Sequence, residues 1–111
     1  MHFLFIFLYD SGFLENFLEE LLQQEVEEVF VAEAQQLKEI LAFRIPLFKE
    51  LQTVIGTTRK ESKIIFALVK EEKTIEKMIK NWKEEMDLEK EEIATIMSFP
   101  VKVWHISPHV Y

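Results

Sequence analysis

Two apolar stretches decide the fold of this chain: residues 3–9 read Phe-Leu-Phe-Ile-Phe-Leu-Tyr, and residues 64–69 read Ile-Ile-Phe-Ala-Leu-Val. A β-strand sends alternate side chains to opposite faces of its sheet, so a strand with one face in water alternates apolar and polar residues. Neither stretch alternates in this way. We therefore expect both faces of the sheet to be covered where these two strands lie.

Length and composition predict one folded domain over residues 1–111. Its 49% hydrophobic and 30% charged residues are typical of a globular protein of this size. The chain has no cysteine, which excludes disulfides, cysteine-bound zinc and thiol catalysis. Because proteins of reducing compartments lack disulfides, this composition suits the cytoplasm.

The charge is acidic and unevenly distributed. The net charge is −7, and it arises in residues 1–58, because residues 59–111 hold equal numbers of acidic and basic side chains. An acidic chain without a basic stripe is a poor partner for nucleic acid or for an anionic membrane. The apolar N-terminus has no positive leader and is too short to cross a bilayer, so a buried strand is expected there rather than a signal peptide.

Two amphipathic helices are predicted from the spacing of apolar residues. The first covers about 12 residues after Asp10-Ser11-Gly12, whose side-chain oxygens can cap a helix. The second spans about residues 71–86. Its apolar stripe consists of Ile75, Met78, Ile79, Trp82 and Met86.

Two further strands are expected at the edges of the sheet. Residues 26–34 form a strand that is polar at both ends, as edge strands often are. Residues 93–99 form the last strand. Pro100 interrupts it, so residues 101–106 are either a bent continuation or a separate edge strand.

A long excursion, residues 35–63, separates the second strand from the third. Leu37, Ile40 and Leu41 have the spacing of a short helix. Pro46 suits the first turn of another helix, which Gly56 would end. The apolar face of that second helix consists of Leu47, Phe48, Leu51, Val54 and Ile55.

This order of elements predicts an α+β fold, a ferredoxin-like β-α-β-β-α-β sandwich with a helical insertion between strands two and three. Right-handed crossovers place both main helices on one side of a four-stranded antiparallel sheet, with residues 3–9 and 64–69 in the two central strands. The other face would then expose more apolar surface than the roughly 300–600 Å² that a monomer tolerates. We expect another copy of the chain to cover it.

The order of elements, the long excursion and the stretch Ser98-Phe99-Pro100-Val101-Lys102-Val103 resemble the PII-like signalling proteins. The resemblance is closest to a small, uncharacterised branch described as nitrogen regulatory protein P-II. It extends over most of residues 3–104 and includes Arg44-Ile45-Pro46-Leu47-Phe48, Leu51 with Gly56, and Lys63-Ile64-Ile65-Phe66. It implies a homotrimer whose sheets pack about an axis, with ligands bound in clefts between subunits.

Departures from the PII pattern limit what the resemblance implies. PII proteins carry a modifiable tyrosine in a flexible loop after strand two, whereas residues 35–63 contain no tyrosine. They also carry a glycine-rich turn with a lysine, and later arginines, that grip ATP phosphates. Residues 86–92 are acidic and free of glycine, and no arginine follows Phe99. We therefore assign no ATP or other cofactor and exclude uridylylation of the loop.

One basic, hydroxyl-rich loop precedes the third strand. It can either hold a small anionic metabolite in a subunit cleft or remain a solvated loop. Arg44, which lies among apolar neighbours, can pair with a glutamate or reach the same ligand. The candidate ligand-binding residues are Arg44, Thr57, Thr58, Arg59, Lys60 and Lys63.

No metal site or catalytic set is predicted. His105 and His109 would share a metal only on a helix, which Pro108 opposes, so a frayed tail is the better interpretation. There is no glycine-framed serine and no phosphate-binding glycine loop. Trp82 is expected in the core, whereas Trp104 belongs on an edge strand or at an interface, where aromatic residues are enriched.

Three hypotheses for function follow. The first is a non-enzymatic, PII-like trimer that senses a small molecule or docks on a protein partner through residues 35–63. The second is a structural or interaction module of the ferredoxin-like class, with that excursion folded back into its own core. The third is a metal-responsive trimer that resembles the copper-tolerance proteins of the same fold.

Overall fold

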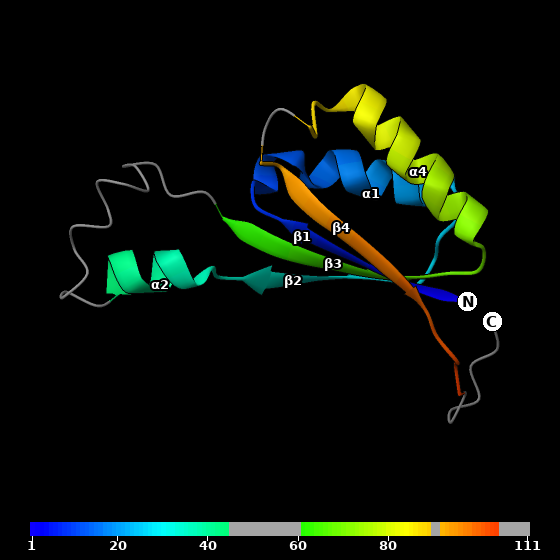
Figure 1. Cartoon of the computed structure of the whole chain (residues 1–111), viewed down its shortest axis with the longest axis horizontal. Coiled ribbons are helices and arrows are strands. Elements are labelled where there is room, and N and C mark those ends of the chain that lie inside the picture. Colours follow the sequence, from blue (N-terminus) through cyan, green and yellow to red (C-terminus); the bar gives the residue numbers. More distant parts are fainter. Residues whose placement is uncertain (45–60, 90–91, 105–111) are drawn as a thin grey trace.

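The computed structural model describes residues 1–44, 61–89 and 92–104, with the side chains of residues 42–44 left out. The described part is an α+β structure in which helices and strands alternate (Figure 1). The elements are β1 (His2–Leu8), η1 (Ser11–Phe13), α1 (Leu14–Gln23), β2 (Val29–Ala34), α2 (Leu37–Arg44), β3 (Ser62–Val69), α4 (Glu72–Glu85) and β4 (Ala94–Pro100).

The four strands form one antiparallel sheet in the order β2-β3-β1-β4. The two strands predicted to be central, β1 and β3, are central, and β2 is at an edge as its polar ends predicted. Helices α1 and α4 lie together on one side of the sheet (Figure 1). This arrangement is compatible with the ferredoxin-like class of α+β folds.

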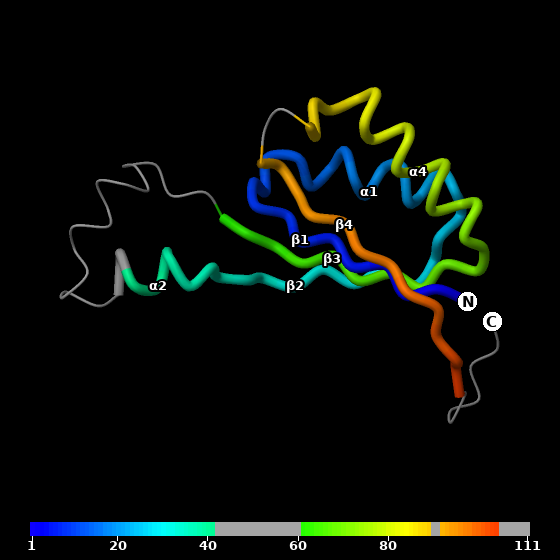
Figure 2. Tube along the Cα trace, in the orientation of Figure 1, coloured from blue at the N-terminus to red at the C-terminus, as the bar shows by residue number. Residues whose placement is uncertain are grey.

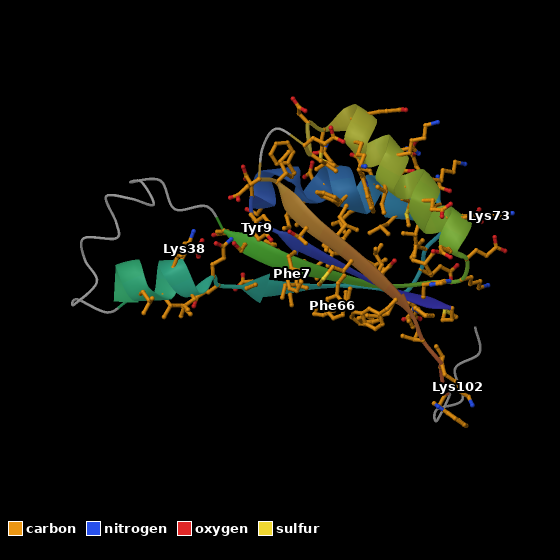
Figure 3. All side chains as sticks on the ribbon, in the orientation of Figure 1. Phe7, Tyr9, Lys38, Phe66, Lys73 and Lys102 are labelled. Carbon is orange, nitrogen blue, oxygen red and sulfur yellow. The ribbon has the colours of Figure 1, made fainter. Side chains whose placement is uncertain are left out.

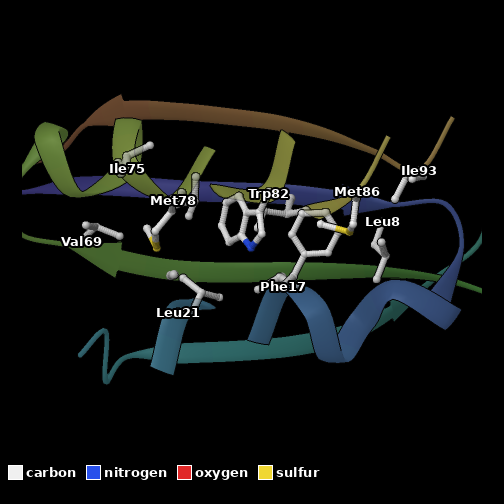
Figure 4. Packing of buried hydrophobic residues seen from close by; sticks show 13 residues of the cluster. Leu8, Phe17, Leu21, Val69, Ile75, Met78, Trp82, Met86 and Ile93 are labelled. Carbon is white, nitrogen blue, oxygen red and sulfur yellow. The ribbon is translucent and has the colours of Figure 1, made fainter. Parts of the chain in front are cut away.

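The hydrophobic core lies between the sheet and the two helices (Figure 4). Alternate residues of β1 and β3 point into it, and the predicted stripe of α4 meets them. Phe17 of α1 contacts Trp82 of α4 with ring centroids 5.0 Å apart. The buried residues, none more than 4% exposed, are Leu4, Ile6, Leu8, Phe17, Leu21, Ile65, Ala67, Val69, Ile75, Met78, Trp82, Met86 and Ile93.

Polar side chains join the two helices beside this core. The carboxylate of Glu20, a residue only 6% exposed, accepts hydrogen bonds from the amides of Asn81 at 2.7 Å and Gln24 at 3.0 Å. Asn16 donates to Glu85 at 2.8 Å. A buried carboxylate is tolerated when its oxygens accept hydrogen bonds, so these contacts fix how α1 and α4 lie against each other.

The predicted cap at Asp10 is confirmed. Asp10 has extended backbone angles, and its Oδ1 accepts a hydrogen bond from the Gly12 N–H at 3.0 Å. This bond satisfies one of the N–H groups that the start of a helix leaves without a partner. The helical segment opens with the single 3-10 turn η1 and continues as α1.

The predicted start of the second strand at residue 26 is wrong, because α1 ends in a left-handed turn that occupies these residues. Glu25 has φ 60. The N–H of Glu25 donates to Leu22 O, and the N–H of Val26 donates to Leu21 O, both at 3.0 Å. This is the Schellman pattern, which usually places glycine at the left-handed position. β2 therefore begins only at Val29.

The excursion after β2 is described in part. α2 confirms the short helix expected from Leu37, Ile40 and Leu41, and it lies beyond the end of the sheet, away from α1 and α4 (Figures 1 and 2). The helix expected after Pro46 and the stop at Gly56 lie outside the described residues. At the other end, β4 includes Pro100, and residues 101–104 continue from it without strand pairing.

A helix that crosses a membrane needs about 20 consecutive apolar residues. In the part of the chain that the structure describes, no helix has the length and apolar composition needed to cross a bilayer.

The left-handed Glu25 predicts a stabilising substitution. Glu25→Gly removes the crowding that a side chain suffers at this φ, so the free energy of unfolding should rise by about 0.5–1 kcal/mol. Urea denaturation at one fixed protein concentration measures it. Glu27→Gly is the matched control, because Glu25 is the only non-glycine residue with positive φ among those described. The control should lower stability, and an equal loss in both variants would contradict the assignment.

Candidate functional site

The sheet face opposite the helices is apolar across all four strands. Residues paired in an antiparallel sheet point to the same face. One row of partners runs Phe30, Phe66, Phe5, Met97 across the sheet. The two neighbouring rows are Leu68, Phe3, Phe99 and Ala32, Ile64, Phe7, Thr95. We call the ten apolar residues of these rows the aromatic face. The remaining residue of the three rows, Thr95, is polar.

The rings of the aromatic face contact one another. Phe5 is central, with ring centroids 4.7 Å from Phe3, 5.0 Å from Phe66 and 6.0 Å from both Phe7 and Phe99. Figure 3 shows Phe66 on the side of the sheet away from the helices. Six of the ten phenylalanines of the chain belong to this face. The sheet thus carries a second apolar cluster, separate from the core.

The aromatic face is open to water in a single copy. Phe30 is 66% exposed, Met97 45% and Phe99 44%, and the rings of the two central strands are half-buried. A phenylalanine presents roughly 200 Å² when fully exposed, so the face leaves on the order of 500 Å² of apolar surface uncovered. This area lies within the roughly 300–600 Å² of the largest patch on a typical monomer, so the expected excess over that range is not confirmed. The same area is comparable to the apolar part of one side of a standard protein–protein interface, about 800 Å² in all.

One end of the aromatic face is polar. The hydroxyl groups of Tyr9 and Thr95 share a hydrogen bond of 2.6 Å. Thr95 is the partner of Phe7 in the last row, and Tyr9 follows that row at the end of the sheet where β1 leads into η1. This pair therefore marks the boundary at which the apolar surface stops.

A hollow of about 660 Å³ lies where β2 ends and β3 begins, beside the start of α2. Three of its described lining residues are glutamates, Glu33, Glu39 and Glu61, and one is Lys63. Lys63 Nζ lies 3.7 Å from Glu33 Oε1 and 4.0 Å from Glu61 Oε2. The described lining therefore combines one ion-paired cation with three carboxylates, which opposes a highly charged anion.

Of the predicted ligand-binding residues, Lys63 alone has a described side chain, and it lies in this hollow. Arg44 ends α2, but its side chain is not described. Thr57, Thr58, Arg59 and Lys60 lie outside the described residues, as do His105 and His109. Within residues 1–44, 61–89 and 92–104, no three histidine or acidic side chains are grouped closely enough to hold a metal ion.

Sequence reasoning overlooked two contributions to these surfaces. The prediction of an apolar face considered mainly the two central strands. Phe30 and Phe99 of the edge strands add two of the largest exposed groups to the aromatic face. The alternation of side chains along the edge strands, residues 26–34 and 93–99, could have assigned both rings to this face. The pairing of Lys63 with Glu33 required the β2–β3 register, which no local pattern reveals.

The sequence was compared with family models and with curated proteins. Neither the family models nor the curated proteins searched contain a match to this sequence.

The ion pairs of Lys63 should contribute little to stability. The carboxylate partners are 91% and 75% exposed, and exposed pairs are typically worth about 0–1 kcal/mol. In a double-mutant cycle of Lys63→Gln and Glu33→Gln, urea denaturation should give a coupling energy below about 1 kcal/mol that falls further with added salt. A larger coupling, insensitive to salt, would show that the hollow is dry rather than open. Lys73→Gln on exposed α4 surface is the control for loss of a charge.

Proposed function

We propose that this protein is a non-enzymatic, PII-like regulatory protein that acts as a homo-oligomer, with three copies as the expected number. Its ligand is a small molecule or a protein partner bound where copies meet. The proposal includes the finer fold assignment, a ferredoxin-like sandwich with residues 35–63 inserted between β2 and β3. The α+β architecture and the resemblance of the sequence to PII-like proteins support it.

The aromatic face is the observation that carries the proposal. At about 25 cal/mol per Å², covering this face on two copies is worth about 25 kcal/mol. Association costs roughly 4–15 kcal/mol in lost translational and rotational freedom. The rows of the aromatic face contain no charged side chain, so a second apolar face can cover them without burying an unpaired charge.

The acidic hollow supports a small-molecule ligand. Its volume of about 660 Å³ falls within the roughly 300–1,000 Å³ of known ligand pockets. Lys63 supplies a cation at its wall, and Arg59 and Lys60 precede it in sequence. Because Glu33, Glu39 and Glu61 also line it, a metabolite with one carboxylate suits the hollow better than a nucleoside triphosphate does.

The position of α2 supports a protein partner at the same end of the molecule. This helix lies beyond the sheet rather than on it (Figure 1), and its first residue, Leu37, is 68% exposed. An apolar side chain held away from the body is available to a groove on another protein.

Charge placed in the aromatic face should abolish assembly. Phe66 lies in the middle row, so Phe66→Glu would bury a carboxylate between copies, and light scattering should report single chains of 13.3 kDa. Leu22→Glu is the matched control, because Leu22 is 76% exposed on α1 and lies on no strand. The control should keep the wild-type mass. Equal masses for all three proteins would show that the aromatic face is not the interface.

A thermal-shift screen tests the ligand. A bound metabolite raises the melting temperature as occupancy rises. Small monocarboxylates should shift the wild-type protein more than adenine nucleotides do, and Lys63→Gln should remove the shift whereas Lys73→Gln should retain it. If no compound raises the melting temperature of the wild-type protein, the proposal of a small-molecule ligand fails and docking of a protein partner is left.

A further inference from the structure

The chain leaves the sheet at the end of β4 as a short arm, residues 101–104, which we call the β4 arm. The N–H of Val101 donates to Met1 O at 3.0 Å, and this is the last backbone hydrogen bond between the arm and the sheet in the described part of the chain. Beyond it the arm runs away from the sheet on the side opposite α1 and α4 (Figures 1 and 2). The arm therefore points toward the space that the aromatic face borders.

The β4 arm carries the most exposed aromatic side chain among the described residues. Trp104 is 73% exposed. The ammonium of Lys102 in the same copy lies 4.4 Å from the centroid of its ring. An indole held in water by one exposed cation–π contact gains only about 0.5–1 kcal/mol, far less than burial of the ring would provide.

The arm is continuous with the aromatic face. Phe99, one residue before Pro100, has its ring 5.7 Å from Phe3 and 6.0 Å from Phe5. A copy that covers these rings therefore comes within a few residues of Trp104. Because an extended chain advances about 3.3 Å per residue, the arm reaches roughly 13 Å past the end of β4.

The free edge of β2 offers a matching surface on another copy. Phe30, at the end of the aromatic face, is 66% exposed, and Val31, which points to the opposite face of the strand, is 43% exposed. The carboxylate of Glu33 is 91% exposed, and Glu27 lies just before the strand. The exposed ring of Phe30 suits the indole of Trp104, and the carboxylates along this edge suit the ammonium of Lys102.

We infer that the β4 arm of one copy lies against the β2 edge of a neighbouring copy, with Trp104 as the buried anchor and Lys102 facing the glutamates. This inference rests on the proposed self-association and adds to it a contact that extends from the aromatic face onto the β2 edge. Such a contact joins different surfaces of the two copies, and its repetition closes a ring when the rotation between copies divides a full turn. It also covers the edge of β2 that no other described strand pairs with.

Fluorescence quenching of the full chain by acrylamide tests the anchor. Trp82 is fully buried and Trp104 is exposed in a single copy, so the difference between wild type and Trp104→Phe reports Trp104 alone. The masses of both proteins are measured in the same samples by light scattering. In an assembled wild type, the Trp104 signal should be quenched several-fold more slowly than free tryptophan, and Trp104→Ala should weaken assembly about tenfold or more.

The outcomes separate this inference from the proposed function. An assembled protein whose Trp104 is quenched as fast as free tryptophan overturns the anchor and leaves self-association intact. A single 13.3 kDa chain overturns both. Slow quenching that is lost on dilution to single chains supports the inference.

Cross-linking locates the surface that receives the arm. The chain has no native cysteine, so Val103→Cys can carry a benzophenone probe at one site. Mixed assemblies of ¹⁴N- and ¹⁵N-labelled copies distinguish links between copies from links within one. Links between copies should map to residues 27–34. If they map to the helices instead, the β2 edge is not the receiving surface.

Discussion

Everything in this structure depends on a sheet that is apolar on both faces while its own helices cover only one. Leu4, Ile6 and Leu8 of β1 are completely buried beneath α1 and α4. Their alternate neighbours Phe3, Phe5 and Phe7 point the other way, because strand geometry leaves no third direction. A one-residue shift of register would exchange the two faces without making either polar. The composition of the strands therefore leaves an apolar face that the helices of the same copy do not cover.

The same constraint organises the rest of the surface. Charged side chains are absent from the paired rows of the aromatic face and gather elsewhere, on the helices and around the hollow beside Lys63. A face without charge suits permanent contact with another apolar face, whereas a charged hollow open to water suits a small ligand that comes and goes. In the function that we propose, assembly and binding use separate parts of one domain, and the β4 arm extends the assembling part.

Much of the fold was predictable because its signals are local. The unbroken apolar runs identified the central strands, the stripe of α4 identified its buried face, and Asp10 identified the start of a helix. The start of β2 was not predictable, since a glutamate occupies the left-handed position where glycine is the usual signal. The candidate site was less predictable than the fold. Lys63 meets Glu33 only through strand register, and most of the predicted ligand-binding residues lie outside the described part of the chain.

Hydroxyl-radical footprinting, read by mass spectrometry on the protein at working concentration, tests most directly whether the aromatic face is covered. Met97, Phe30 and Phe99 are 45%, 66% and 44% exposed in one copy, whereas Met86 in the core is 4% exposed. If another copy hides the face, Met97 and the two rings should be oxidised nearly as slowly as Met86. Oxidation of all three at the rates that their single-copy exposures set would show that the face meets water, and would contradict the account.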